Sequence, residues 1–168
     1  INIMSQIKVN SIVPVNGLPS GANGGIIQVI QTFKDDAEST TSTSFADLNG
    51  MSATITPSSS SNKILISFSL CLSSQHNPVT FINLVRGSQN IAQPASAAAL
   101  STIQLYSDGD KIMQQGFEFL DSPSTTNSTT YKLQWRTNNS SQTSKLNQYY
   151  NQTNFHSSST ITLMEVSA

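Results

Sequence analysis

The chain alternates between apolar and polar residues over many short segments, which is the pattern of half-buried β-strands. The clearest segment is 63–72, where every second residue is large and apolar. Two further segments with strong alternation are 130–136 and 157–168, the last running to the end of the sequence. The apolar positions on one side of the first segment are Ile64, Ile66, Phe68, Leu70 and Leu72. We expect that side to lie in a core.

Weaker alternation predicts further strands between turn residues. These strands span 26–33, 43–48, 51–56, 79–86, 100–106 and 111–120. Asn49-Gly50 is interpreted as a hairpin turn between two of them, because both residue types tolerate positive φ. The alanine-rich segment 91–100 is expected to be a loop. About eight to ten short strands, with no long helical stretch, predict an all-β fold, an antiparallel β-sandwich or jelly roll.

Two prolines and a glycine-rich run set residues 1–25 apart from the rest. We therefore divide the chain into an N-terminal attachment arm and linker at 1–25 and a head domain at 26–168. Within the arm, 7–13 alternates well enough for a short strand, and an isolated strand has backbone groups that need a partner. The residues expected to anchor the arm are Ile7, Val9, Ile12 and Val13. The alternative interpretation is a disordered terminus.

Apolar side chains fall on both faces of two predicted strands, the first of the head and the last of the chain. A strand in an isolated sandwich normally exposes one face to water, so this pattern indicates a subunit interface. The residues assigned to that interface are Ile27, Val29, Thr162, Met164 and Val166. We therefore expect an oligomer. Glu118 and Glu165 lie among apolar neighbours in strands, and we expect them to face outward unless Lys or Arg pairs with them.

The low content of charged residues argues against partners that are bound mainly by charge. Only 10% of the 168 residues are charged, against about 25% in an average soluble protein, and the formal net charge is −1. We expect no nucleic-acid binding and no attraction to an anionic membrane. No apolar run approaches the ~20 residues of a membrane-spanning helix, so membrane insertion is not expected either. Cys71 is the single cysteine, interpreted as a buried apolar side chain or else as an interchain or reactive thiol.

Candidate catalytic and metal-binding residues are few. His76 and His156 lie in separate predicted loops and are expected to be solvated, or else to share a metal site on a symmetry axis. Four acidic residues near the first turn are expected to be solvated, with calcium binding as the alternative. They are Asp35, Asp36, Glu38 and Asp47. The Gly-x-Ser-x-Gly motif of serine hydrolases does not occur. We expect no enzyme activity, no metal and no cofactor.

Four segments of the sequence carry a family resemblance. They are MSQIKVNSIVPVNGLPSG, GGIIQVIQTFKDDAESTTSTSFADLNGMSATITPSSSSNKILI, TTYKLQWRTNN and SSSTITLMEVSA. Together they resemble the C-terminal module, and the short attachment segment before it, of tail-fibre and other virion appendage proteins of marine bacteriophages. The likeness lies in the strand and loop pattern and covers nearly the whole chain.

The resemblance implies a jelly roll like that of tumour necrosis factor and complement-type heads, which assemble as homotrimers. It also implies a virion location, with the arm contacting other virion proteins and the terminal strand near the threefold axis. The side chains that would fill the subunit core are Tyr131, Leu133, Trp135, Ile161 and Leu163. Because only about 25 residues stand where long fibres carry stalk repeats, a short appendage, head fibre, spike or capsid decoration protein fits better than a long distal fibre.

A polar excursion at 138–157 is the best candidate binding site. Carbohydrate recognition needs aromatic faces that stack on sugar C–H surfaces and amides that hydrogen-bond sugar hydroxyls. The excursion contains both, and its candidate residues for host glycan or receptor binding are Asn147, Gln148, Tyr149, Tyr150, Phe155 and His156. The alternative is that its tyrosines fix the excursion to the sandwich or to a neighbouring subunit.

Three function classes follow from the sequence. The first is a non-enzymatic virion structural protein that presents its head outward and binds a host surface carbohydrate. The second is a secreted binding module, either lectin-like or ligand-like, without a virion. The third is a depolymerase or other hydrolase with a site between subunits, which would need paired acidic residues across a groove.

Overall fold

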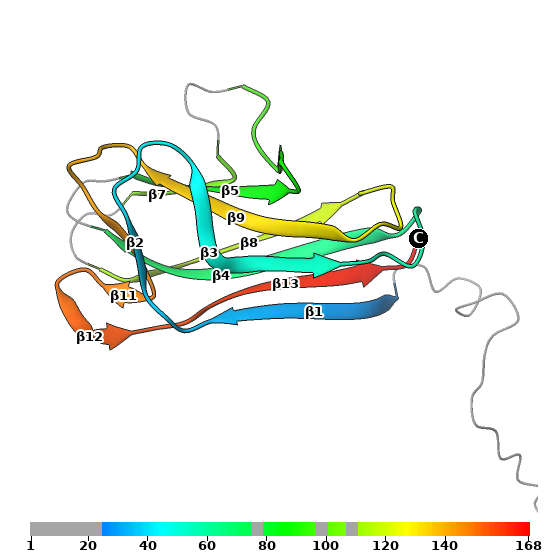
Figure 1. The fold of residues 1–168 in the computed structure, drawn as a ribbon, viewed down its shortest axis with the longest axis horizontal. Coiled ribbons are helices and arrows are strands. Elements are labelled where there is room, and N and C mark those ends of the chain that lie inside the picture. The colour runs from blue at the N-terminus through cyan, green and yellow to red at the C-terminus, as the bar shows by residue number, and fades with distance from the viewer. Residues whose placement is uncertain (1–24, 75–78, 97–100, 107–110) are drawn as a thin grey trace, which may run out of the picture.

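The protein is an antiparallel β-sandwich, as the alternation predicted. The computed structural model describes residues 25–74, 79–96, 101–106 and 111–168, so the predicted arm strand at 7–13 lies outside the described residues. Every regular element in these ranges is a β-strand, and the strands pack face to face as two sheets with a small hairpin at one end (Figure 1). The predicted fold class is confirmed.

The larger sheet has six strands and runs in the order β1-β13-β4-β10-β2, with β8 on the other side of β4. Its strands are β1 (Ile26–Lys34), β2 (Glu38–Thr40), β4 (Lys63–Ser74), β8 (Met113–Asp121), β10 (Ser144–Leu146) and β13 (Ser159–Val166). The five-stranded sheet runs β3-β9-β5-β6, with β7 also paired to β5. Its strands are β3 (Ala46–Ile55), β5 (Val79–Arg86), β6 (Gln89–Ile91), β7 (Ile103–Tyr106) and β9 (Thr129–Thr137). The remaining strands, β11 (Gln148–Tyr149) and β12 (Gln152–His156), form the end hairpin.

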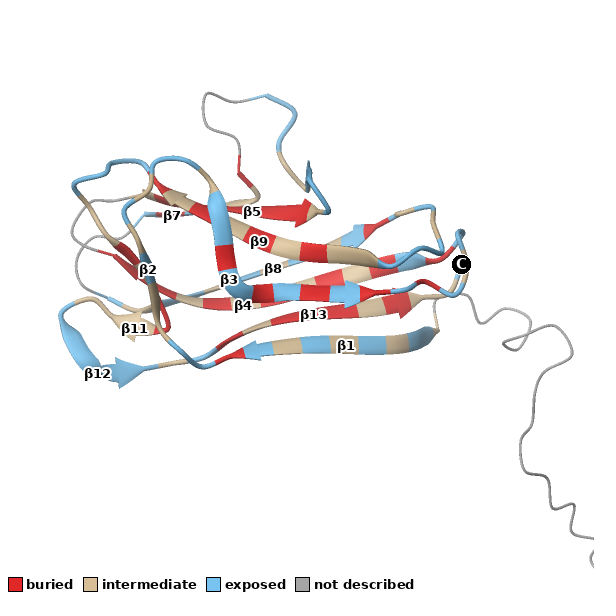
Figure 2. Cartoon of the chain, in the orientation of Figure 1, coloured by how far each residue is buried: buried red, intermediate tan, exposed pale blue. Residues whose placement is uncertain are grey.

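The core lies between the two sheets, where buried positions alternate with exposed ones along most strands (Figure 2). All five side chains that the resemblance assigned to the subunit core are at most 1% exposed: Tyr131, Leu133, Trp135, Ile161 and Leu163. The five alternating apolar residues of 63–72 belong to the same core. The thirteen described strands exceed the expected number because the added ones have only two to five residues, too few for alternation to be visible.

The predicted hairpin at Asn49-Gly50 is wrong. Both residues lie inside the single strand β3, which bends sharply there (Figure 1). Its pairing with β9 is interrupted between Asp47 and Ser52, as in a β-bulge. Leu48 and Met51 are both buried, and the three extra residues on β3 let two residues three apart reach the same core. Gly50 has φ of +71°, so the positive φ that suggested a turn serves a bulge.

Replacing Gly50 with alanine is expected to destabilise the head by about 1–2 kcal/mol, because a left-handed backbone disfavours a Cβ atom. Space is not the cause, since a Cβ there would meet the Lys34 side chain at an ordinary 3.6 Å. Gly116→Ala is the matched control, with negative φ and a nearest contact of 3.5 Å. Urea unfolding of both variants checks the prediction, and equal midpoints would contradict it.

Glu165 contradicts the expectation that it faces outward. It is fully buried on the core side of β13 although no Lys or Arg pairs with it among the described residues. One carboxylate oxygen accepts a hydrogen bond from Gln28 Nε2 at 2.5 Å. The other accepts from Ser58 N and Oγ, both at 2.7 Å, and from Asn62 Nδ2 at 2.6 Å. Neutral donors from two segments, β1 and the loop between β3 and β4, thus replace the expected cation. Glu118, by contrast, is exposed on β8.

The two ends of the described head meet at one end of the sandwich. Gly25 N donates to Ser167 Oγ at 3.2 Å, and Ser167 N donates to the Gly25 carbonyl at 2.9 Å. The β11–β12 hairpin lies at the opposite end of the long axis (Figure 1). The head therefore has one end where the chain enters and one end where the hairpin projects.

Candidate functional site

The predicted binding excursion folds in part as the β11–β12 hairpin. Gln148 pairs with His156 and Tyr149 pairs with Gln152, with an irregularity between the two pairs. All five residues of β12 are exposed, and the side chain of Phe155 is 60% exposed. The hairpin therefore presents an accessible, mostly polar surface.

Asn147 holds the base of this hairpin and is not part of its surface. It is fully buried with φ of +57°, and its backbone N–H donates to the Cys71 carbonyl at 2.8 Å. Its Nδ2 donates to the carbonyls of Lys34 and Asp36, at 2.9 and 3.2 Å, while its Oδ1 accepts from Ser159 Oγ at 2.6 Å. All of these bonds fix three strands together. Asn147 is therefore removed from the candidate binding residues, as a correction.

The aromatic residues of the hairpin form a small cluster. The rings of Tyr149 and Phe155 meet edge to face with centroids 6.2 Å apart. Lys145 Nζ lies 5.4 Å from the centroid of the Tyr150 ring and donates to the Tyr150 carbonyl at 3.0 Å. Tyr150 is therefore partly fixed by its neighbour on β10, which agrees with the alternative sequence interpretation for that residue. Tyr149 and Phe155 remain the accessible pair.

The polar candidates of the hairpin are already partly engaged. Gln148 Oε1 accepts from Lys145 Nζ at 3.1 Å, and its Nε2 donates to the Thr153 carbonyl at 3.4 Å. A ring nitrogen of His156 lies 2.7 Å from the same carbonyl. His156 is exposed, as expected, whereas His76 lies outside the described residues. The hairpin thus offers one aromatic pair flanked by amide and imidazole groups.

A second candidate surface is an apolar row across the outer face of the six-stranded sheet. The strand registers place Val29 opposite Met164, Met164 opposite Leu65, and Leu65 opposite Leu120. Four strands thus contribute one apolar residue each at the same level. The exposed fractions of Val29 and Leu120 are 54% and 47%, which is high for large apolar side chains. We call these four residues the apolar row.

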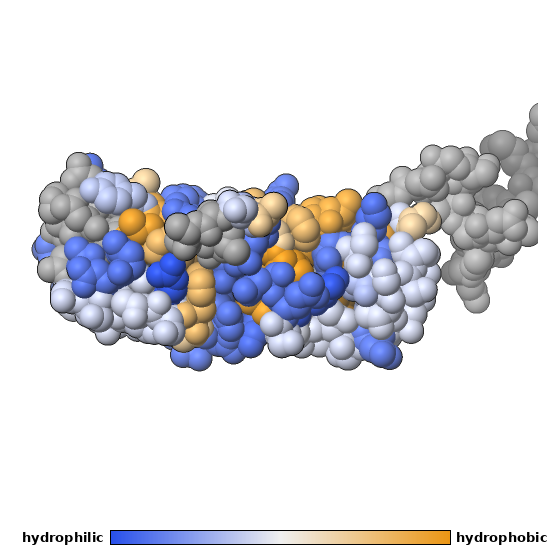
Figure 3. Space-filling view, turned by 90° about the horizontal axis from the view of Figure 1, so that it is seen from above, coloured by the Kyte–Doolittle hydropathy of each residue, from blue (hydrophilic) through white to orange (hydrophobic). Residues whose placement is uncertain are grey.

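The apolar row contains two residues assigned to the subunit interface from the sequence and two that were missed. Ile27 and Val166 continue the patch at one side, and Ile27 is 47% exposed. Thr162 is on the same face but only 8% exposed, since Gln31 covers and hydrogen-bonds it at 2.9 Å. On the face seen from above in Figure 3, by contrast, apolar residues form separate islands among hydrophilic ones.

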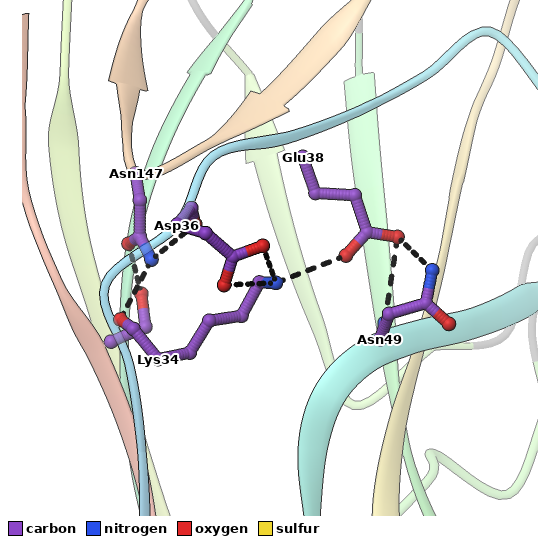
Figure 4. Close-up of polar contacts among 6 residues, drawn as sticks. Lys34, Asp36, Glu38, Asn49 and Asn147 are labelled. Atoms are coloured by element: carbon purple, nitrogen blue, oxygen red, sulfur yellow. Dashed lines mark hydrogen bonds and ion pairs between the residues drawn. The ribbon is translucent and has the colours of Figure 1, made fainter.

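Three of the four acidic residues considered for calcium divide between two lysines, Asp36 and Glu38 beside Lys34 and Asp47 beside Lys132. Lys34 is only 5% exposed, and its Nζ lies 2.8 and 2.9 Å from the carboxylate oxygens of Asp36 and 3.6 Å from Glu38 (Figure 4). Hydrogen bonding to Lys34 lowers the pKa of Asp36. Asp47 lies elsewhere, 2.8 Å from Lys132 Nζ, whose hydrogen bond lowers the pKa of Asp47. The two sites are ion pairs on either side of the β3 bend.

An open pocket of about 400 Å³ lies beside Arg86. Its lining is rich in hydroxyl groups: Arg86, Gly87, Pro123, Thr125, Ser128, Thr129 and Thr130. Arg86 Nη1 lies 2.8 Å from an Asp121 carboxylate oxygen that also accepts from the Tyr131 hydroxyl at 2.6 Å. Burial and this hydrogen bond to Asp121 raise the pKa of Tyr131. The Arg86 guanidinium is therefore already bound to Asp121, the acceptor of the Tyr131 hydroxyl, and is less available to a ligand in the pocket.

The described ranges hold neither a metal-binding cluster nor a membrane-crossing helix. They contain no group of three or more His, Cys, Asp or Glu side chains placed to hold a metal ion. In the same ranges no helix is long and apolar enough to cross a membrane. Cys71 is a free thiol of intermediate exposure on the outer face of β4, so its predicted burial is only partly met.

Comparison with known proteins gives structural neighbours but no family. No protein-family model and no curated protein matches the sequence. Among solved structures, a chain of the infectious bursal disease virus Gx strain is similar over 96% of this chain, with 13% identity and a TM-score of 0.48. A chain of the infectious bursal disease virus VP2 subviral particle is similar over 93%, with 14% identity and a TM-score of 0.42. This chain spans 43% and 42% of those two chains.

Proposed function

We propose that the chain is a non-enzymatic structural protein of a bacteriophage particle. In this proposal its heads assemble as homotrimers, the arm at 1–25 attaches each head to the particle, and the β11–β12 hairpin contacts a host surface carbohydrate. The proposed role is a short appendage such as a head fibre, spike or decoration protein. The sequence resemblance motivates this role.

The observation that carries the assembly is the apolar row. A line of four aliphatic or thioether side chains across the outer face of a sheet, with its two end members about half exposed, is unfavourable in water and is typical of a surface that another protein covers. The chain enters the sandwich at the end opposite the hairpin, an arrangement that suits attachment at one end and presentation at the other (Figure 1). Three hairpins on one rigid trimer would multiply a weak contact with sugar.

Immunogold labelling tests the structural role directly. Antibody raised against the purified head should label intact virions of the phage that encodes the chain, at repeated positions on the particle. Unlabelled virions, together with free protein in the lysate, would contradict the proposal and favour the secreted binding module instead.

Substitution of the hairpin aromatics tests the carbohydrate contact. Tyr149→Ala with Phe155→Ala should weaken binding to an array of bacterial surface polysaccharides by about tenfold or more, since stacking aromatics contribute roughly 0.5–1.5 kcal/mol each beyond their buried area. Three hairpins lose that contribution together. Tyr106→Ala is the matched control, an aromatic residue of similar exposure outside the hairpin. Unchanged binding of the double variant would exclude the hairpin.

A further inference from the structure

Strand β8 is a long edge with no described partner on one side. Its nine residues pair with β4 alone, so half of its backbone N–H and C=O groups face away from the sheet. Phe117 and Phe119 point toward the core but are only partly buried. Because a long unpaired edge beside partly buried aromatics attracts another strand, β8 has the features of a strand-docking site.

The outer face of the same strand carries an unpaired acid. Glu118 is exposed and accepts a hydrogen bond from Ser67 Oγ at 3.4 Å. No Lys or Arg of the described ranges forms an ion pair with it. A strand that docks on β8 therefore needs apolar residues on one face and a cation on the other.

The segment 7–13 of the chain, IKVNSIV, has that pattern in one antiparallel register. If Lys8 lies opposite Glu118, then Ile7 lies opposite Phe119 and Val9 opposite Phe117, on the core side. The same register places three further pairs side by side: Ser11 with Gln115, Ile12 with Gln114, and Val13 with Met113. Cross-strand pairs of this kind, apolar with apolar and cation with anion, each stabilise an antiparallel ladder by about 0.2–1 kcal/mol.

Reach favours the arm of another copy over the chain's own arm. β1 and β8 run in opposite directions with β13 and β4 between them, so in this register Val13 and Gly25 lie at opposite ends and opposite edges of the sheet. That separation is roughly 36 Å, from about 31 Å along the strands and about 19 Å across the four inter-strand steps from β1 to the added strand. The twelve Cα–Cα steps from 13 to 25 span at most about 40 Å when fully extended. Two prolines and a glycine-rich run occupy most of that linker.

We propose that residues 7–13 of one copy add as an antiparallel strand to the free edge of β8 in a neighbouring copy, with Lys8 facing Glu118. In place of the particle contact proposed above, the partner of residues 7–13 is then a second copy of this chain, and the arm links heads to one another. This inference rests on the proposed assembly into homo-oligomers and names the partner of the arm. The main-chain hydrogen bonds supply affinity, and Phe117 and Phe119 fix the register.

Crosslinking of two single-cysteine variants tests the proposal. Lys8→Cys and Glu118→Cys, each in a Cys71→Ser background and with tags of different mass, are co-expressed and treated with a short bis-maleimide. A crosslinked heterodimer on a denaturing gel is expected, because the two positions are direct neighbours only between copies. Lys8→Cys with Gln114→Cys is the matched control, displaced by four residues or roughly 13 Å, and should crosslink about tenfold less.

Three outcomes would overturn the inference. Absence of the heterodimer would show that the arm does not lie on β8 of another copy. Equal yields with Glu118→Cys and Gln114→Cys would show contact without the stated register. Crosslinking only within one chain, when both cysteines are on the same chain, would assign the edge to that chain's own arm. Because the assay needs no virion, its failure is separate from a failure of immunogold labelling.

A charge exchange supplies an independent readout. Lys8→Glu and Glu118→Lys should each lower the crosslinking yield between Val9→Cys and Phe117→Cys chains, and the two exchanged charges together should restore it. Restoration is expected only if the two side chains face each other. Equal losses in the single and the combined variants would contradict the register.

Discussion

A head that carries aspartate at both Val29 and Leu120 is expected to fold and to remain monomeric. Both side chains are about half exposed in the single chain, so the substitutions cost little in the folded head, about 1 kcal/mol of strand propensity. In an assembly that covers the apolar row, the same carboxylates would be buried without a partner. An uncompensated buried charge costs about 3–5 kcal/mol, so association should weaken by at least a hundredfold.

Light scattering coupled to size exclusion measures this effect. The unchanged protein is expected at three times the chain mass and the double variant at the mass of one chain, with the same circular dichroism spectrum. The matched control is Ser52→Asp with Thr54→Asp, which adds the same charge to exposed positions of β3 in the other sheet. A monomeric unchanged protein, or a trimeric double variant, would contradict the proposed interface.

The arm and the apolar row make separate contributions, which the same measurement distinguishes. Leu120 lies in β8, two residues after Glu118 and on the same outer face, so the row ends on the strand that is proposed to receive the arm. Substitution in the row should abolish association even with the arm present. A single charge reversal, Lys8→Glu or Glu118→Lys, should weaken crosslinking while the head contact persists.

The sequence predicted the strands whose alternation is undisturbed. Strand β4 was found because its apolar residues repeat every second position over ten residues, and that period suffices to define a core face. The out-of-phase Leu65 and Leu120 were a readable sign of the outer apolar row. They were missed because β4 and β8 were each assigned a single apolar face. The first and last strands of the head were assigned two apolar faces, and for that reason Val29 and Met164 were found.

The errors arose where distant contacts decide the local structure. Asn49-Gly50 permits positive φ in a turn and in a bulge alike, and the burial of Leu48 and Met51 on one side selects the bulge. Asn147 resembles any polar loop residue in the sequence, yet its side chain links β1 to β13. No local pattern identifies such a residue, because its partners are more than ten and more than a hundred positions away.

Glu165 carries the largest expected dependence of stability on pH. Burial alone would raise the pKa of this carboxyl, but hydrogen bonds from Asn62, Gln28 and Ser58 outweigh that effect and lower its pKa to about 2, from a usual 4.5. A lowered pKa in the folded state means that the stabilisation is complete above pH 4.5 and is lost as the pH falls toward 2. A shift of this size corresponds to about 3 kcal/mol of the free energy of unfolding.

Replacing Glu165 with glutamine should remove most of this dependence. The new amide must place its NH₂ toward donors on one side, either Gln28 or the group from Ser58 and Asn62. Reversal of the Gln28 amide would not relieve the conflict, because its Nε2 also donates to the Thr56 carbonyl at 2.8 Å. We therefore expect a loss of about 2–3 kcal/mol at pH 7, as for other hydrogen bonds to a charged group.

Urea unfolding at pH 7 and pH 3, in the monomeric background of Val29→Asp with Leu120→Asp, isolates the contribution of Glu165. Other carboxylates with lowered pKa values, such as Asp36 and Asp47, affect both proteins equally and cancel in the difference. The difference in stability between Glu165 and glutamine should shrink as the pH falls from 7 to 3, because the carboxyl takes up a proton near pH 4.5 in the unfolded chain while it stays mostly ionised in the folded chain. Glu118→Gln is the matched control on an exposed position and should change stability by less than about 0.5 kcal/mol at either pH. A constant difference between pH 7 and pH 3 would show that the pKa of Glu165 is the same in the folded and the unfolded chain, which contradicts the prediction.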